Sequence, residues 1–100
     1  MIYWLLTAHF IFDAALQPDW MLKAKKYNWY VMAEHCAIWT GGIALILAMY
    51  GAFAWWKIVF LFSGHFLIDM WKIKTAPTAL SMKYLLVDQL LHLFQILIVW

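Results

Sequence analysis

The sequence has no arginine, a single cysteine and few charged residues, and each shortage excludes a class of protein. Charged residues make up 12% of the chain, whereas soluble domains carry about 25%. The seven basic residues are all lysines and the formal net charge is only +2, which argues against a nucleic-acid partner. Because Cys36 stands alone, we expect neither an intrachain disulfide nor a thiolate cluster for copper or an iron–sulfur centre.

What the sequence does contain is apolar. Hydrophobic residues make up 68% of the chain, eight of its 100 residues are tryptophan, and the mean hydropathy is +0.79. This composition predicts an integral membrane protein. Since a bilayer crossing takes about 20 residues, residues 1–100 can form four short membrane helices in a single domain and little else.

The pattern of apolar and polar segments predicts an all-α bundle of four transmembrane helices with antiparallel neighbours. We expect helices at residues 2–17, 29–50, 53–71 and 84–100, joined by polar loops at Pro18–Asn28 and Lys72–Lys83 and by a tight turn near Gly51. Asn28 is the expected cap of the second helix. The first segment lacks a basic region and a small-residue cleavage site, so we expect a membrane helix rather than a signal peptide.

The lysines predict the orientation. Six of the seven fall in the two polar loops, and only Lys57 lies on the opposite side. The positive-inside rule then places both loops in the cytoplasm and both termini outside the inner membrane. The lipid bilayer is the first expected partner, and the short first and last helices also suit packing in a homo-oligomer or a larger membrane complex.

Three of the apolar segments carry a histidine and an aspartate four residues apart, a spacing that puts both side chains on one face of an α-helix. The pairs are His9 with Asp13, His65 with Asp69, and Asp88 with His92. The last pair is reversed in order, as it must be if its helix runs antiparallel to the other two. His35 falls at a similar depth in the remaining segment. The sequence therefore predicts one buried polar layer near the cytoplasmic surface.

Neutral imidazoles with carboxylates are ligands for a divalent metal, and zinc is the first choice. The expected metal ligands are His9, Asp13, His35, His65, Asp69, Asp88 and His92. These donors suffice for one four-coordinate ion with carboxylates orienting the histidines, or for two ions that share an aspartate. A haem site is not favoured, because aspartates one turn from the histidines would not help it. A metal-free network that locks the helices or passes protons is the simpler alternative.

A zinc ion that keeps a position for water could generate hydroxide just beneath the lipid headgroups. The sequence thus suggests a metal-dependent hydrolase of a lipid or phosphoester, with Asp88 or Glu34 as the general base. Glu34 lies about 100° around the helix from its neighbour His35. The alternative is a non-catalytic membrane subunit whose His/Asp network handles ions or protons or packs helices. A third hypothesis is an accessory protein that only binds a membrane partner.

Four stretches of the chain carry a family resemblance. They are HFIFDAALQPDWM from His9 to Met21, the isolated His35, SGHFLIDMWK from Ser63 to Lys72, and VDQLLHLF from Val87 to Phe94. In this order they resemble the small bacterial and phage membrane proteins of the domain of unknown function 3307 family, over nearly the whole chain. The resemblance implies a membrane fold and this site, but no settled activity. The HxxxD elements also show a looser similarity to membrane-bound metal-dependent hydrolases.

Overall fold

The computed structural model describes residues 1–15, 19–24, 28–75 and 82–100. Among these residues all regular structure is helical, which confirms the all-α class. The elements are α1 (Ile2–Phe10), the π-helix η1 (Ile11–Ala15), α2 (Asp19–Ala24), α3 (Trp29–Met49), α4 (Trp55–Thr75) and α5 (Met82–Val99).

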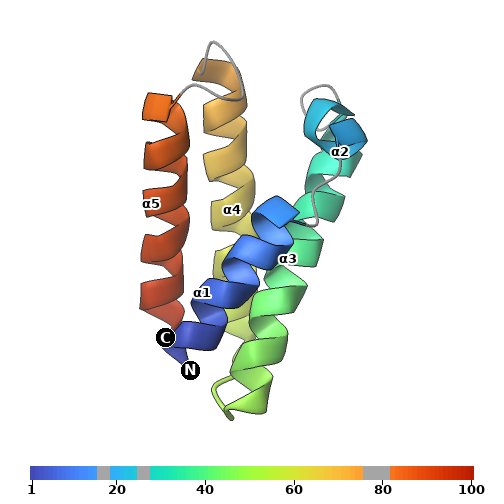
Figure 1. The fold of residues 1–100 in the computed structure, drawn as a ribbon. Coiled ribbons are helices and arrows are strands. Elements are labelled where there is room, and N and C mark those ends of the chain that lie inside the picture. The colour runs from blue at the N-terminus through green and yellow to red at the C-terminus, as the bar shows by residue number, and fades with distance from the viewer. Residues whose placement is uncertain (16–18, 25–27, 76–81) are drawn as a thin grey trace.

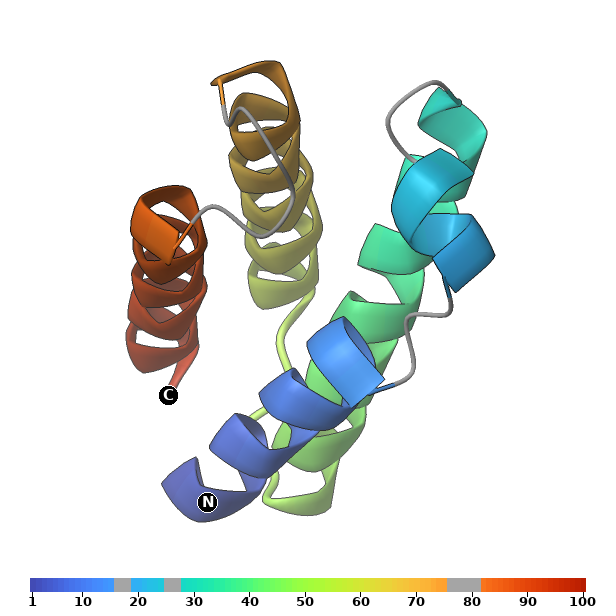
Figure 2. The same ribbon diagram turned by 45° about the horizontal axis from the view of Figure 1, so that its top comes forward.

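The long helices run up and down in alternation, as the sequence predicts for antiparallel neighbours. Both termini and the connection from α3 to α4 lie at one end of the bundle, while α2, the end of α4 and the start of α5 lie at the other (Figure 1). Helix α4 packs against α3 and α5, and α1 crosses α3 and also contacts α5. Seen from a second angle, α1 with α3 and α4 with α5 form two neighbouring pairs (Figure 2).

Local chemistry explains two of the boundaries. The side chain of Asn28 accepts a hydrogen bond from the backbone N–H of Tyr30 at 3.0 Å, so it caps α3 as predicted. After α3, Gly51 has a φ of +70°, in the left-handed region that glycine enters without strain. This residue therefore permits the tight turn into α4.

Other boundaries differ from the prediction. The expected first loop contains the short helix α2, whose Met21, Leu22, Lys23 and Ala24 favour helix once a neighbouring helix supports them. Helix α4 continues through Lys72 to Thr75, two residues before Pro77, because Lys72 is tied to α5 by an ion pair rather than released into a loop. Residues 16 and 17 of the expected first helix lie outside the described residues.

The first helix also changes type along its length. Residues 2–10 are α-helical, but Ile11–Ala15 form a π-helix, whose wider turn changes the angle between successive side chains. The α-helical i,i+4 rule therefore does not hold between His9 and Asp13. Asp13 lies in this π-helix and reaches the polar interior.

The interior is divided along the bundle axis. An apolar core fills the half nearer the termini, made of Leu5, Ala8, Trp39, Ile43, Leu47, Leu61, Ile96 and Val99. Next to it lies a buried polar layer of His9, Asp13, His35, His65, Asp69, Asp88 and His92, in which every residue is at most 8% exposed. The predicted polar layer thus exists, at the level where α1 and η1 meet the three long helices.

Candidate metal centre

Four donor atoms from three elements converge in the polar layer. Nε2 of His35 on α3 lies 3.2 Å from Oδ1 of Asp13 and 3.2 Å from Oδ2 of Asp69. Nε2 of His65 on α4 lies 3.0 Å from Nε2 of His35. The same nitrogen is 3.6 Å from Asp13 Oδ1 and 3.5 Å from Asp69 Oδ2. We call these four residues the main centre.

The spacing of these atoms suits a tetrahedral metal ion. Ligands placed 2.0–2.2 Å from a zinc ion at tetrahedral angles are about 3.3–3.6 Å apart. Five of the six separations between donor atoms of the main centre run from 3.0 to 3.6 Å, and the four atoms all lie within 4.8 Å of one another. Two imidazole nitrogens and two carboxylate oxygens therefore surround a point that a divalent cation could occupy.

Ring stacking holds His65 in place. The His65 ring stacks on the indole of Trp39 at a centroid distance of 4.3 Å and on the His92 ring at 4.1 Å. The side chains of Trp39, His65 and His92 are all fully buried. Such contacts add to the burial energy, so the orientation of His65 is set by packing before any ion is bound.

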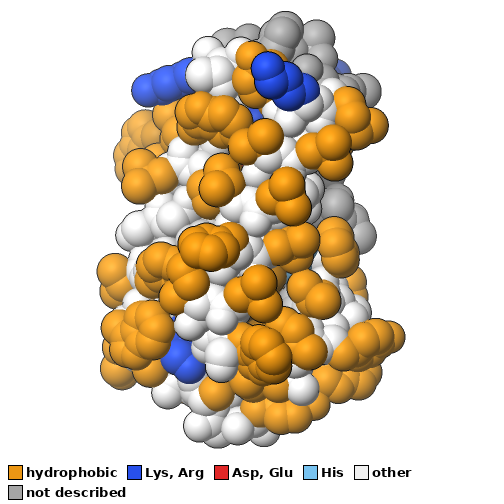
Figure 3. Space-filling model, turned by 90° about the vertical axis from the view of Figure 1, so that its left-hand side faces the viewer, with side chains coloured by type: hydrophobic (Ala, Val, Ile, Leu, Met, Phe, Trp, Pro, Cys, Tyr) orange, Lys and Arg blue, Asp and Glu red, His pale blue; other side chains and the backbone are white. Residues whose placement is uncertain are grey.

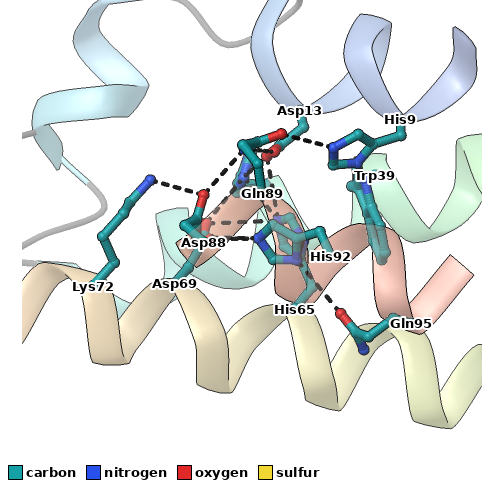
Figure 4. Close-up of polar contacts among 11 residues, drawn as sticks. His9, Asp13, Trp39, His65, Asp69, Lys72, Asp88, Gln89, His92 and Gln95 are labelled. Carbon is teal, nitrogen blue, oxygen red and sulfur yellow. Dashed lines mark hydrogen bonds and ion pairs between the residues drawn. The ribbon is translucent and has the colours of Figure 1, made fainter. Parts of the chain in front are cut away.

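A second set of donors adjoins the first. One ligand atom each from Asp13, Asp88 and His92 lie within 4.8 Å of one another; we call this set the outer group, and it shares Asp13 with the main centre. Oδ1 of Asp88 lies 3.2 Å from Nε2 of His92. Oδ2 of Asp88 accepts hydrogen bonds from Lys72 Nζ at 3.2 Å and Gln89 Nε2 at 3.1 Å (Figure 4).

A directed hydrogen-bond chain leads from Trp39 to Asp13. The indole N–H can only donate, so Trp39 Nε1 donates to His9 Nδ1 at 3.0 Å. His9 then carries its proton on Nε2 and donates to Oε1 of Gln89 at 2.8 Å. The Gln89 amide nitrogen donates in turn to Oδ2 of Asp13 at 3.1 Å. With this tautomer neither nitrogen of His9 has a lone pair left for a metal.

His92 occupies a branch point. Its Nε2 lies 3.1 Å from Oδ1 of Asp69, a residue of the main centre. Its Nδ1 lies 3.1 Å from Nδ1 of His65 and 3.4 Å from Oε1 of Gln95. The amide nitrogen of Gln95 donates to the carbonyl of Phe60 at 3.3 Å, so the oxygen of Gln95 faces His92. A proton on His92 Nδ1 would thus have two acceptors.

The structure brings most of the predicted ligands together. Asp13, His35, His65 and Asp69 form the main centre, and Asp88 and His92 join Asp13 in the outer group. His9 lies in the same layer but contacts Trp39 and Gln89. Glu34 is half-buried and contributes to neither group.

Four residues that the sequence did not point to as part of the site contact the polar layer: Trp39, Lys72, Gln89 and Gln95. A signal existed for each. Trp39 lies mid-helix, away from the expected interfacial belts, Lys72 follows Asp69 by three residues, Gln89 is next to Asp88, and Gln95 follows His92 by three.

Comparisons with known proteins place the chain in a family. Neither the curated proteins nor the solved structures contain a match to it. A family model does match, over residues 1–100, and its description is "Protein of unknown function (DUF3307)". Since this model covers the whole chain, the protein belongs to the DUF3307 family.

Proposed function

We propose that the protein is a four-helix membrane protein that binds one divalent metal ion, with zinc as the first choice, at the main centre. The observation that carries the proposal is the convergence of His35, His65, Asp13 and Asp69 at tetrahedral spacing inside an apolar bundle. An imidazole and carboxylate donor set is one that zinc accepts readily. No cysteine sulfur belongs to either donor group among the described residues.

The charges of the layer also favour a single divalent ion. The carboxylates of Asp13 and Asp69 would balance the two positive charges of the ion, while Asp88 is balanced by Lys72 at 3.2 Å. The four histidines can then stay neutral. Because an uncompensated charge is very unfavourable in an apolar medium, one divalent ion leaves the layer neutral, whereas two would leave an excess of two positive charges.

The surface supports placement in a bilayer. Seven of the eight tryptophans are exposed, between 38% for Trp71 and 76% for Trp55, and aliphatic side chains are exposed around the bundle. The face in Figure 3 is covered by hydrophobic side chains, with lysines near its two ends. A soluble protein rarely exposes so large an apolar patch. The outside of this bundle is thus more apolar than its polar layer, as expected in lipid.

Two helices, α3 and α5, are long and apolar enough to cross a membrane, and the apolar stretch Ile2–Asp13 is shorter. We propose that α1 with η1, together with α4, supplies the other two crossings. Lys23, Lys72, Lys74 and Lys83 lie in α2, at the end of α4 and at the start of α5, which share one end of the bundle (Figure 1). The positive-inside rule assigns this end to the cytoplasm and both termini to the other side.

The donor set bears on the choice between ion binding and catalysis. Catalytic zinc keeps an open position for water, whereas sites with four protein ligands are typically not catalytic. Hydrolysis of a lipid or phosphoester would require one of the four donors to withdraw. Metal-ion binding without hydrolysis is therefore the function that we propose.

Metal analysis of the protein purified in mild detergent without chelator tests the proposal. We expect one zinc ion per chain in the wild type and less than about a tenth of that in His65→Ala, which removes a ligand. Ser63→Ala, an exposed position two residues earlier on α4, is the matched control and should retain the ion. A wild type that binds no divalent metal even after zinc is added would refute the proposal.

The same samples test hydrolysis. We expect no zinc-dependent turnover of a chromogenic phosphodiester or of a short-chain phospholipid by the wild type. Turnover that His65→Ala abolishes would show that a donor withdraws and that the site is catalytic.

A further inference from the structure

We propose that the outer group of Asp13, Asp88 and His92 is an entry site, through which a divalent cation reaches the main centre, and that one ion occupies the two sites in turn. This inference rests on the proposed function, since it supplies a route to the main centre. It also makes the bound ion exchangeable rather than permanently enclosed.

The first argument is the position of the shared ligand. Asp13 belongs to both donor groups, and its side chain is 9% exposed, compared with 0–2% for His35, His65, Asp69, Asp88 and His92. Among the described donors it is therefore the one that an incoming ion can reach first. An ion held by Asp13 can pass from one group to the other without losing that ligand.

The second argument is an oxygen atom without a hydrogen bond. Among the described residues, Oδ1 of Asp88 is buried and has no hydrogen-bond donor, although Oδ2 of the same carboxylate accepts from Lys72 and Gln89. Leaving a buried carboxylate oxygen unpaired is unfavourable unless something else satisfies it. Oδ1 lies 3.2 Å from Nε2 of His92, so a cation between these two atoms would be bound by both.

The third argument shows why the two sites cannot be filled together. Only one proton fits between Nδ1 of His65 and Nδ1 of His92, which are 3.1 Å apart. When both imidazoles are neutral, the ring that carries this proton on Nδ1 has a lone pair on Nε2. The other ring accepts the proton with its Nδ1 lone pair, so its own proton is on Nε2. Hence either His65 can bind an ion at the main centre or His92 can bind one in the outer group, but not both.

Each tautomer suits its own state. With the ion in the outer group, His92 carries the shared proton on Nδ1, where Gln95 Oε1 is a second acceptor. With the ion at the main centre, His65 carries it, and His92 Nε2–H can donate to Asp69 Oδ1 at 3.1 Å. Two protons are present in both states and the total charge of the layer is the same. The shared proton moves from His92 Nδ1 to His65 Nδ1. The Nε2 proton moves from His65 to His92 through the carboxylate of Asp69, whose oxygens lie 3.5 Å from His65 Nε2 and 3.1 Å from His92 Nε2. The transfer of the ion therefore needs no proton from outside.

Rates of metal exchange distinguish an entry ligand from a structural residue. Co²⁺ serves as the probe, because its visible absorption reports tetrahedral coordination, and its association is followed by stopped flow and its release by excess chelator. In Asp88→Asn we expect association and release both to slow by about tenfold or more, with Kd changed less than about threefold. Asp69→Asn is the matched contrast, since it removes a ligand of the main centre, and should weaken Kd by at least about 100-fold.

A second variant acts in the opposite direction and changes a partly exposed residue. Lys72→Gln removes the cation that competes for Asp88, so Co²⁺ association and release should both become faster. An unchanged association rate in both Asp88→Asn and Lys72→Gln would overturn the inference, as would two ions per wild-type chain at saturation. Either result is compatible with a divalent ion at the main centre. Failure of the wild type to bind Co²⁺ or Zn²⁺ at all would refute the proposed function itself.

Discussion

The indole N–H of Trp39 donates a hydrogen bond to Nδ1 of His9 at 3.0 Å, and this contact decides what His9 can do. Because the indole group is only a donor, His9 must use the lone pair of Nδ1 to accept and must carry its proton on Nε2. From sequence alone His9 is as good a metal ligand as His65. In the structure it orients Asp13 through Gln89 instead.

This arrangement predicts different results for two histidine-to-alanine substitutions. His9→Ala should retain one ion per chain but bind it about 10–100-fold more weakly, the usual loss when a group that orients a ligand is removed. His65→Ala should lose the ion altogether. Isothermal titration with zinc in detergent measures both. Equal loss of binding in the two variants would identify His9 as a direct ligand.

The sequence could predict the polar layer because burial of imidazoles and carboxylates at one depth follows from helix length and direction. Within α4 and α5 the i,i+4 pairs are real: His65 Nε2 lies 3.5 Å from Asp69 Oδ2, and His92 Nε2 lies 3.2 Å from Asp88 Oδ1. The cap at Asn28 and the turn at Gly51 could also be predicted from the sequence, since both depend on local backbone chemistry.

The sequence could not predict which residues of the polar layer bind the ion and which only orient a ligand. It depends on the π-helix Ile11–Ala15, which turns Asp13 away from the pairing with His9 that an α-helix would give. It also depends on contacts between distant segments, such as Trp39 with His9 and Gln89 with Asp13. No spacing rule along one helix contains these contacts.

Two glycines provide a paired test of packing around the centre. A Cβ at Gly64 would overlap the side-chain amide of Gln95, which faces His92. The amide would have to move away and lose its hydrogen bond to the Phe60 carbonyl. Gly64→Ala should therefore lower the free energy of unfolding by about 1–3 kcal/mol, as overpacking usually does. Gly41→Ala is the control, because a Cβ there meets nothing within 4 Å. Thermal unfolding in detergent compares them; equal stability of the two variants would show that Gln95 is not confined by α4.

Metal removal should destabilise the fold. An ion that binds only the folded protein adds about 2.7 kcal/mol when its free concentration is 100 times Kd. We therefore expect the Tm to fall when a chelator is added and to recover with zinc. Asp69→Asn should unfold at the same temperature with and without chelator. A chelator-insensitive Tm in the wild type would mean that helix packing alone holds the polar layer together.

The proposed orientation predicts which residues are accessible from each side of the membrane. In a Cys36→Ser background, Trp100→Cys lies at the terminal end of α5 and Met82→Cys at the lysine-bearing end, and the native residues are 58% and 64% exposed. In spheroplasts, a membrane-impermeant maleimide should label Trp100→Cys at once and Met82→Cys only after lysis. Labelling of both variants before lysis would contradict four crossings with both termini outside.

X-ray absorption at the zinc edge of the purified, zinc-loaded protein tests the central claim most directly. The account predicts four nitrogen or oxygen ligands at about 2.0–2.1 Å with scattering from two imidazole rings, and the same two rings in His9→Ala, which retains the ion. A spectrum with sulfur in the first shell, or with six oxygen ligands from water, would contradict a centre built from His35, His65, Asp13 and Asp69.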